Sequence, residues 1–370
     1  MRLRFWGTRG SIAAPGPGTN HFGGNTSCIE LTTADGKRFI LDCGTGARLL
    51  GNELMKTSRA PIAATILLTH THWDHIQGFP FFAPLFVESN HFNVYGPDGA
   101  HLSLHDVLAG QMEHHYFPVE LSQLAARISY RDIAEGTHQL DGLRVHAQQM
   151  NHPSATLGYR IEADGMSVCY LSDHEPFAEE VWREGALAPA RLDLIANEGD
   201  RRHAEYMTNA DVVIHEAQYT PEEYLTKKNW GHSTYTYVVQ LAAVAGVRRL
   251  FLTHHDPSHD DAFIARMEQR AQDLAQRLGS GMEVRCAYEG CEILVEPAPT
   301  LNQETVRYES SEVQLGQRVA LIGMAEAQYG HSLVLGTAAG SRFSLLACRT
   351  TRKITNATIR KSITLLINIP

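Results

Sequence analysis

The chain has 370 residues, of which 20 are His, 32 are Lys or Arg and 41 are Asp or Glu. Hydrophobic residues make up 43% and charged residues 20%, which is typical of a soluble globular protein. The sequence has no apolar run of about 18 residues, which excludes a membrane-spanning helix. The N-terminus lacks the apolar core of a signal peptide, so we expect a cytoplasmic protein. The high His content is notable because His titrates near neutral pH and ligates metals.

Charge is distributed unevenly along the chain. Residues 301–370 carry eight Lys or Arg and four Asp or Glu, a net charge of +4, which leaves −13 for residues 1–300. A surface that binds a long phosphate backbone needs clustered Lys and Arg, so this balance argues against a large nucleic acid as the partner. The six Cys residues form no CxxC pair and are expected to be reduced and mostly buried.

Short apolar and β-branched runs predict strands that alternate with helical segments. The predicted strands are, in chain order, Leu3–Trp6, Cys28–Thr32, Phe39–Asp42, Thr65–Thr69, Phe92–Tyr95, Val145–Gln149, Gly158–Ile161, Val168–Leu171, Val212–His215, Leu250–Thr253 and Ile293–Val295. The predicted helices are Ala47–Lys56, Leu102–Gln111, Pro221–Lys227, Thr234–Ala245 and Asp260–Leu278. Strands come first and are then mixed with helices, which indicates an α/β fold of packed sheets covered by helices.

Two prolines in the segment 296–300 end this pattern. We therefore divide the chain into a domain of residues 1–297 and a short C-terminal extension of residues 298–370. The extension contains Gly-rich turns and alternating runs, but no motif that indicates its role.

The sequence HTHWDH, directly after the fourth predicted strand, carries the strongest functional signal. On an extended chain His70 and His72 point to the same side, so both imidazoles can bind one ion. After the chain turns, Asp74 and His75 can face a second ion nearby. Zinc binds neutral imidazole nitrogen and carboxylate oxygen, usually with four ligands. This cluster therefore predicts a metal site and not simply a His-rich surface loop.

Further ligands for a two-metal site should follow later strands, and the sequence supplies them. His152, Asp173 and His254 each come directly after an apolar run. A single His at such a position is usually only hydrogen-bonded, but the three residues in this order strengthen the prediction. His255 lies beside His254 and competes with it for the last position.

The pattern HTHWDH followed by His152, Asp173 and His254 resembles the metallo-β-lactamase superfamily. The resemblance runs through residues 1–297 and includes GTRGS (7–11), GGNTSC (23–28) and LDCGTG (41–46). It implies an αββα sandwich with a dinuclear metal site at one edge. By this resemblance His254 is preferred to His255, because it comes first after the strand. The implied ligands are His70, His72 and His152 for one metal and Asp74, His75 and His254 for the other, with Asp173 bridging them.

Two further motifs narrow the resemblance. IHEAQYT (214–220) and WGHST (230–234) look like motifs of ribonuclease Z and its phosphodiesterase relatives, with Gln218 where those proteins have Thr. True β-lactamases and glyoxalase II-type thioesterases lack this pair, so the phosphodiesterase branch is favoured. In the related ribonuclease a His–Glu pair assists the leaving group, and here the pair would be His232 and Glu216. Alternatively, His232 is only a neighbour of the cap of the helix that follows.

The predicted mechanism uses Asp74, His232 and Glu216 together with two divalent ions. Such ions, ~3.5–4 Å apart, stabilise both the attacking and the leaving oxygen and lower the pKa of bound water toward ~7. A bridging hydroxide would then attack, and the net charge of the centre favours an anionic phosphodiester. His232 could protonate the leaving oxygen, while Glu216 fixes its tautomer and favours its cationic form. Zinc is the preferred metal, and manganese and iron are alternatives.

The interval from Leu171 to Asp211 bears on the substrate. Ribonuclease Z carries a long, basic, Gly/Pro-rich arm for tRNA there, whereas this interval is short and mixed in charge. We therefore predict a phosphodiesterase for a small phosphodiester: a cyclic nucleotide, a cyclic phosphate or a short oligonucleotide. The alternatives are a ribonuclease Z-type tRNA 3′-endonuclease, a carboxyl-ester, lactone or thioester hydrolase, and a non-catalytic metal-binding sensor. The oligomeric state stays open, with a homodimer as one alternative.

Other residues near the motifs have two interpretations each. Phe79, Phe81 and Phe82 could stack a nucleobase, but an apolar core turn is favoured. Asp256 and Asp260, close to His254, could orient imidazoles or could be exposed loop charges.

Overall fold

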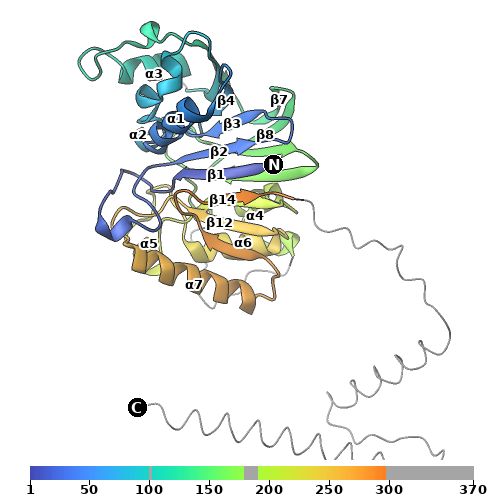
Figure 1. Ribbon diagram of the computed structural model, residues 1–370. Helices are drawn as coiled ribbons and strands as arrows, with labels where there is room; N and C mark the ends of the chain where they lie inside the picture. Colours follow the sequence, from blue (N-terminus) through green and yellow to red (C-terminus); the bar gives the residue numbers. More distant parts are fainter. Residues whose placement is uncertain (100–101, 179–190, 297–370) are drawn as a thin grey trace, which may run out of the picture. The chain divides into compact units, whose positions relative to one another are not determined.

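The computed structural model describes residues 1–99, 102–178 and 191–296. These residues form two seven-stranded sheets that lie face to face, with helices on the outer side of each sheet (Figure 1). This architecture is the predicted αββα sandwich. The predicted extension of residues 298–370 lies outside the described residues.

The first sheet combines the N-terminal strands with the last described strand. It contains β1 (Arg2–Gly7), β2 (Cys28–Thr32), β3 (Arg38–Leu41), β4 (Ala63–Leu67), β5 (His91–Pro97), β6 (Arg127–Ile133) and β14 (Glu292–Leu294). The spatial order is β14-β1-β2-β3-β4-β5-β6. β14, β1, β2 and β3 pair antiparallel, whereas β3 to β6 pair parallel.

The second sheet has the same plan. It contains β7 (Gly136–Leu140), β8 (Leu143–Gln149), β9 (Leu157–Ala163), β10 (Met166–Leu171), β11 (Val212–Glu216), β12 (Arg249–Thr253) and β13 (Glu283–Cys286). β7 to β10 pair antiparallel and β10 to β13 pair parallel. Parallel strands end at a common edge of their sheet, so the polar residues that follow them are brought together there.

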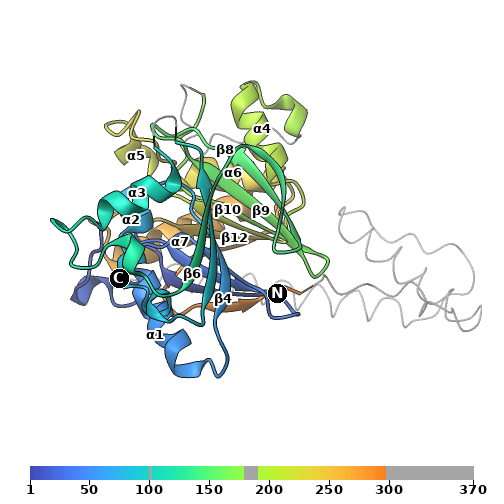
Figure 2. The ribbon, with the colours of Figure 1, turned by 90° about the horizontal axis from the view of Figure 1, so that it is seen from above.

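Helices pack on the outer faces of the two sheets. The helices are α1 (Gly46–Thr57), α2 (Trp73–Ile76), α3 (Leu104–Gln111), α4 (Glu198–Tyr206), α5 (Pro221–Tyr224), α6 (Tyr235–Val244) and α7 (Asp261–Arg277), with short 3₁₀ turns at Pro17–Thr19, Phe79–Phe81, Ala83–Phe86, Leu121–Gln123 and Leu192–Leu194. α1 and α3 lie on the side of the first sheet, and α6 and α7 on the side of the second (Figure 1 and Figure 2).

Three apolar layers hold this sandwich together. Phe39 and Tyr170 are buried between the sheets, whereas Leu50 of α1 and Leu274 of α7 are buried on the faces of their helices that pack on the sheets. Each fully buried large apolar side chain contributes ~1.5–3 kcal/mol of folding free energy. The strand ends that carry polar residues are therefore supported from both sides by packed apolar side chains.

All predicted strands are found, and their ends agree within two residues. The strands that the sequence did not predict, β6, β7 and β13, all lie at sheet edges. β6 and β7 each bury only one residue, so their apolar alternation is weak, and β13 has only four residues. The unpredicted α4 buries only Asp200, His203 and Ala204 and so has no apolar stripe. The helix predicted to reach Lys227 ends at Tyr224.

Two other predictions can be compared with the described residues. Across the described ranges, every helix is too short or too polar to cross a membrane. Cys28, Cys43, Cys169, Cys286 and Cys291 are free and buried. These thiols agree with the prediction of reduced, buried cysteines.

Candidate metal centre

The predicted metal ligands lie in loops that follow strands. His70 and His72 follow β4, and the short helix α2 then carries Asp74 and His75. His152, Asp173 and His254 follow β8, β10 and β12, respectively. Asp173 has φ 51° and His254 has φ 59°, both in the left-handed region. This conformation turns the chain sharply at the end of the strand.

His70, His72 and His152, which we call the His70 cluster, present three ring nitrogens to one point. His72 Nδ1 lies 3.0 Å from His70 Nε2 and 3.2 Å from His152 Nε2. Asp173 Oδ2 lies 3.5 Å from His70 Nε2 and 3.8 Å from His152 Nε2. The four ligand atoms all lie within 4.8 Å of one another, close enough to hold one metal ion.

Asp74, His75 and His254, which we call the His75 cluster, form a second set beside the first. Asp74 Oδ2 lies 3.2 Å from His75 Nε2 and 3.1 Å from His254 Nε2. The second oxygen of Asp173, Oδ1, lies 3.3 Å from both of these ring nitrogens. Asp173 therefore directs one oxygen toward each cluster.

The electrostatics of these groups fit a divalent cation. Burial lowers the pKa of His70 well below its ordinary value, which keeps the ring in the neutral form that binds metal. Burial acts in the same sense on His75, but the Asp74 and Asp173 carboxylates outweigh it and raise the pKa of His75 well above its ordinary value. His75 Nε2 is buried and makes no hydrogen bond although it faces both carboxylates. The chain thus carries His/Asp clusters with the negative potential and the free ring nitrogens that a divalent metal requires.

Outer contacts orient the rings of both clusters. His75 Nδ1 is 2.8 Å from Asp42 Oδ2, and His254 Nδ1 is 3.0 Å from Gln218 Oε1. His152 Nδ1 is 3.0 Å from the carbonyl oxygen of Gly231. These acceptors place the proton on Nδ1 and leave Nε2 free for metal. These orienting roles of Asp42 and Gly231 were not predicted, although Asp42 lies in the LDCGTG motif and Gly231 in the WGHST motif.

Replacing Gln218 with Ala is expected to weaken metal binding by ~10–100-fold, because His254 loses the acceptor that fixes its ring. Titration of the metal-free protein with Zn²⁺ measures the change. Gln139→Ala, an exposed position in β7, serves as the control and should bind as the wild type does. An unchanged affinity in Gln218→Ala would contradict an orienting role.

The two adjacent histidines after β12 have different surroundings. His255 Nε2 lies 2.9 Å from the carbonyl oxygen of Ala287, away from the His75 cluster, so His254 is the residue that joins it. Asp256 reaches His254 only through Gln218, whose Nε2 is 3.4 Å from Asp256 Oδ2. Asp260 instead caps α7.

His232 and Glu216 lie beside the clusters but make no hydrogen bond to each other. His232 Nδ1 is buried without a hydrogen-bond partner, 3.9 Å from Asp173 Oδ2 and 4.0 Å from Glu216 Oε2. Burial lowers the pKa of His232 to about 3, so this geometry does not give the cationic form that we expected Glu216 to favour. Burial raises the pKa of Glu216 to about 8, and its oxygens accept the N–H groups of Gln218 and Ser233. Thr234 caps α6, so the loop also has the capping role that was the alternative.

A cavity of about 560 Å³, which we call the metal cavity, opens onto both clusters. It is lined by Ser11, Thr71, His72, Trp73, Asp74, His152, Pro153, Asp173, Trp230 and His232.

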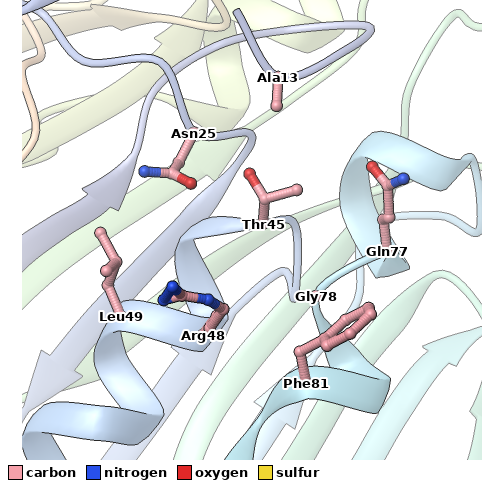
Figure 3. Close-up of a pocket in the computed structure, with 8 residues that line it drawn as sticks. All are labelled: Ala13, Asn25, Thr45, Arg48, Leu49, Gln77, Gly78 and Phe81. Carbon is pink, nitrogen blue, oxygen red and sulfur yellow. The ribbon is translucent and has the colours of Figure 1, made fainter. Parts of the chain in front are cut away.

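The phenylalanines after α2 do not line the metal cavity. Phe79 and Phe82 are fully buried, as the favoured core interpretation predicted. Phe81 is 52% exposed and packs edge-on against Phe117, with ring centroids 5.3 Å apart. Figure 3 shows Phe81 with Thr45 and other residues around a separate cavity of about 500 Å³.

Comparisons with known proteins agree with this fold. Residues 37–255 match the family model described as the beta-lactamase superfamily domain. Ribonuclease Z from Lactococcus lactis subsp. lactis is 27% identical over 310 residues, covering 74% of this chain and 95% of that protein. Ribonuclease Z from Streptococcus suis is 26% identical over 317 residues, covering 75% of this chain and 96% of that protein.

Solved structures with the same fold include three with TM-scores above 0.5. Human tRNase Z, short form, has a TM-score of 0.52 and 22% identity and covers 80% of this chain and 100% of its own. The metallo-beta-lactamase fold protein YhfI from Bacillus subtilis has a TM-score of 0.53 and 16% identity, and the match covers 79% of this chain and 98% of that protein. A diphosphatase from the PhnP family has a TM-score of 0.52 and 16% identity, and the match covers 80% of this chain and 98% of that protein. The chain therefore belongs to the beta-lactamase superfamily, as a metal-dependent hydrolase with the metallo-β-lactamase fold.

Proposed function

We propose that this hydrolase is a dinuclear-metal phosphodiesterase that acts on a small phosphodiester, such as a cyclic nucleotide, a cyclic phosphate or a short oligonucleotide. The observation that carries the proposal is the position of Asp173, whose two carboxylate oxygens face different clusters. The His70 cluster would hold one divalent ion and the His75 cluster the other, with zinc preferred over manganese or iron. When bound, two such ions activate water near neutral pH and stabilise charge on the attacking and leaving oxygens.

The role that we assign to His232 is proton donation to the leaving oxygen. Its ring lies on the wall of the metal cavity, where the negative charge of a bound phosphodiester would favour the imidazolium form, which becomes neutral imidazole when it gives up its proton. Glu216 acts as a positioning residue, because it accepts the backbone N–H of Ser233, directly after His232. Asp74 Oδ2 accepts the backbone N–H of Ser11 at 2.7 Å, which fixes this oxygen beside the ring nitrogens of His75 and His254.

The relatives named ribonuclease Z support cleavage of a phosphodiester bond, and they keep tRNA 3′-processing as the second candidate. Two observations favour a smaller substrate. The interval from Leu171 to Asp211 is short and mixed in charge, unlike the long basic arm that the resemblance to ribonuclease Z implies there. No Lys or Arg is among the described residues that line the metal cavity, whereas a long RNA needs several cationic contacts.

Replacing His232 with Ala is expected to lower kcat by ~10²–10⁴-fold for diesters with an alkoxide leaving group. The effect should be much smaller for bis-p-nitrophenyl phosphate, because nitrophenolate leaves without a proton. Steady-state rates of the metal-loaded wild type and variant, with metal content measured in each, test this difference. An equal loss on both substrates would contradict proton donation by His232.

The same assay should include cyclic nucleotides, cyclic phosphates, dinucleotides, lactones, acyl thioesters and precursor tRNA. We expect turnover of small diesters. Cleavage of precursor tRNA alone would establish the second candidate, and turnover of lactones or thioesters alone would establish an ester hydrolase. A metal-loaded protein that hydrolyses nothing in this set would be the metal-binding sensor.

A further inference from the structure

We infer that the rim of the metal cavity binds a flat aromatic group through Trp73 and Trp230, so that the substrate is a nucleoside phosphodiester. This inference rests on the proposed function and specifies the part of the substrate that the phosphodiester chemistry leaves open. It depends on the exposure of the two indoles, on the contacts that hold Trp230, and on the charge of the cavity.

Trp73 is a large apolar side chain in the middle of the metal motif. Its neighbour His72 belongs to the His70 cluster and its neighbour Asp74 to the His75 cluster, and Trp73 is the first residue of α2. Its side chain is 76% exposed and lines the metal cavity. An indole with this exposure adds little to the core, so its position beside the reacting centre indicates a role in binding.

Trp230 lies on the other half of the chain, in the loop before His232, and is 56% exposed. The loop is held by Glu175, whose buried carboxylate accepts the N–H groups of Asn229 at 2.7 Å and of Gly231 at 2.9 Å. Lys227 Nζ lies 4.1 Å from the centroid of the Trp230 ring. A buried carboxylate and a cation thus fix an exposed aromatic ring, which lowers the entropy cost of stacking a ligand on it.

The charge of the cavity decides which aromatic ligand fits. Two bound cations would attract one phosphodiester, but no Lys or Arg lines the described cavity to bind a second phosphate. The apolar part of the cavity lining consists largely of the indole rings of Trp73 and Trp230 and of Pro153. Nucleobases stack on aromatic side chains with little dependence on base identity. The cavity therefore favours a single phosphodiester joined to a base over a sugar diester without a base.

A matched pair of substrates tests this inference: adenosine 2′,3′-cyclic phosphate and 1-O-methylribose 2,3-cyclic phosphate, which differ only in the base. Trp73→Ala and Trp230→Ala are each expected to raise KM for the adenosine diester about tenfold and to leave KM for the methylribose diester unchanged. Trp73→Phe should retain most of the affinity because it keeps a stacking ring. Tyr116→Ala is the control, since Tyr116 is 78% exposed and does not line the metal cavity.

Equal changes on both diesters, or no change on either, would overturn the inference. If the wild type hydrolyses neither diester, a binding measurement decides the inference by itself, while the proposed function is decided by the full set of small diesters named above. Calorimetry of the metal-loaded protein then compares adenosine 5′-monophosphate with ribose 5-phosphate. Tighter binding of the nucleotide that is lost in Trp73→Ala or Trp230→Ala supports the stacking role, whereas equal binding of the two ligands excludes it.

Discussion

Replacing Asp173 with Asn is expected to lower kcat on a phosphodiester by ~10³-fold or more and to reduce the metal content of the protein. The carboxylate lies 3.3 Å from His75 and His254 through one oxygen and 3.5 Å from His70 through the other. An amide supplies only one good ligand atom and no charge. Metal ions contribute several kcal/mol of transition-state stabilisation, and ~4 kcal/mol corresponds to about 10³ in rate.

The comparison needs a control with the same backbone geometry. Asp173 has φ 51°, and Asn tolerates this left-handed conformation, so the turn should be retained. Asp141 has φ 50° and is exposed in the turn between β7 and β8, so Asp141→Asn should leave activity and metal content unchanged. Elemental analysis and single-turnover rates measure both quantities. Full metal content with near wild-type kcat in Asp173→Asn would exclude a bridging role.

Replacing Asp42 with Ala is expected to destabilise the metal-free protein by ~3–5 kcal/mol. Asp42 is completely buried and accepts hydrogen bonds from the N–H of Thr69 at 2.7 Å and the Tyr170 hydroxyl at 2.7 Å. It also faces His75 Nδ1 at 2.8 Å. Removing the carboxylate leaves these buried donors without their acceptor, which costs the desolvation penalty of each group.

Urea unfolding of the metal-free protein measures this effect without any contribution from metal loss. Asp35→Ala is the control, because the Asp35 side chain is 59% exposed and its removal should change the free energy of unfolding little. Equal unfolding midpoints for the two variants would show that the buried network around Asp42 does not stabilise the fold.

The sequence predicts the parts of the site that are local in the chain. Four of the candidate ligands lie within six residues, and the other three directly follow apolar strands, so chain order and strand position sufficed to bring them into one prediction. Asp42 contacts His75 across 33 positions and Glu175 contacts Gly231 across 56. Such contacts depend on how the sheets pack, which hydrophobic periodicity does not specify.

The aromatic residues illustrate the same limit. A run of phenylalanines after the metal motif suggested stacking, but Phe79 and Phe82 are in the core and Phe81 lines another cavity. Trp73 is within the motif and yet is 76% exposed. Composition identifies aromatic residues, whereas only the packing of the layers determines which of them meets the solvent. For the same reason the central strands were predicted, whereas the edge strands β6, β7 and β13 were not.

The left-handed residues at the strand ends restrict how this centre can change. Asp42 with φ 60°, Asp173 with φ 51° and His254 with φ 59° each adopt a conformation that costs a typical non-glycine residue ~1–2 kcal/mol. Asp, Asn and His are among the side chains most often found there. Cysteine or a β-branched residue at these positions would strain the turn whatever its chemistry. Redesigning the centre for a thiophilic metal would therefore require rebuilding the turns after β10 and β12 before exchanging the ligands.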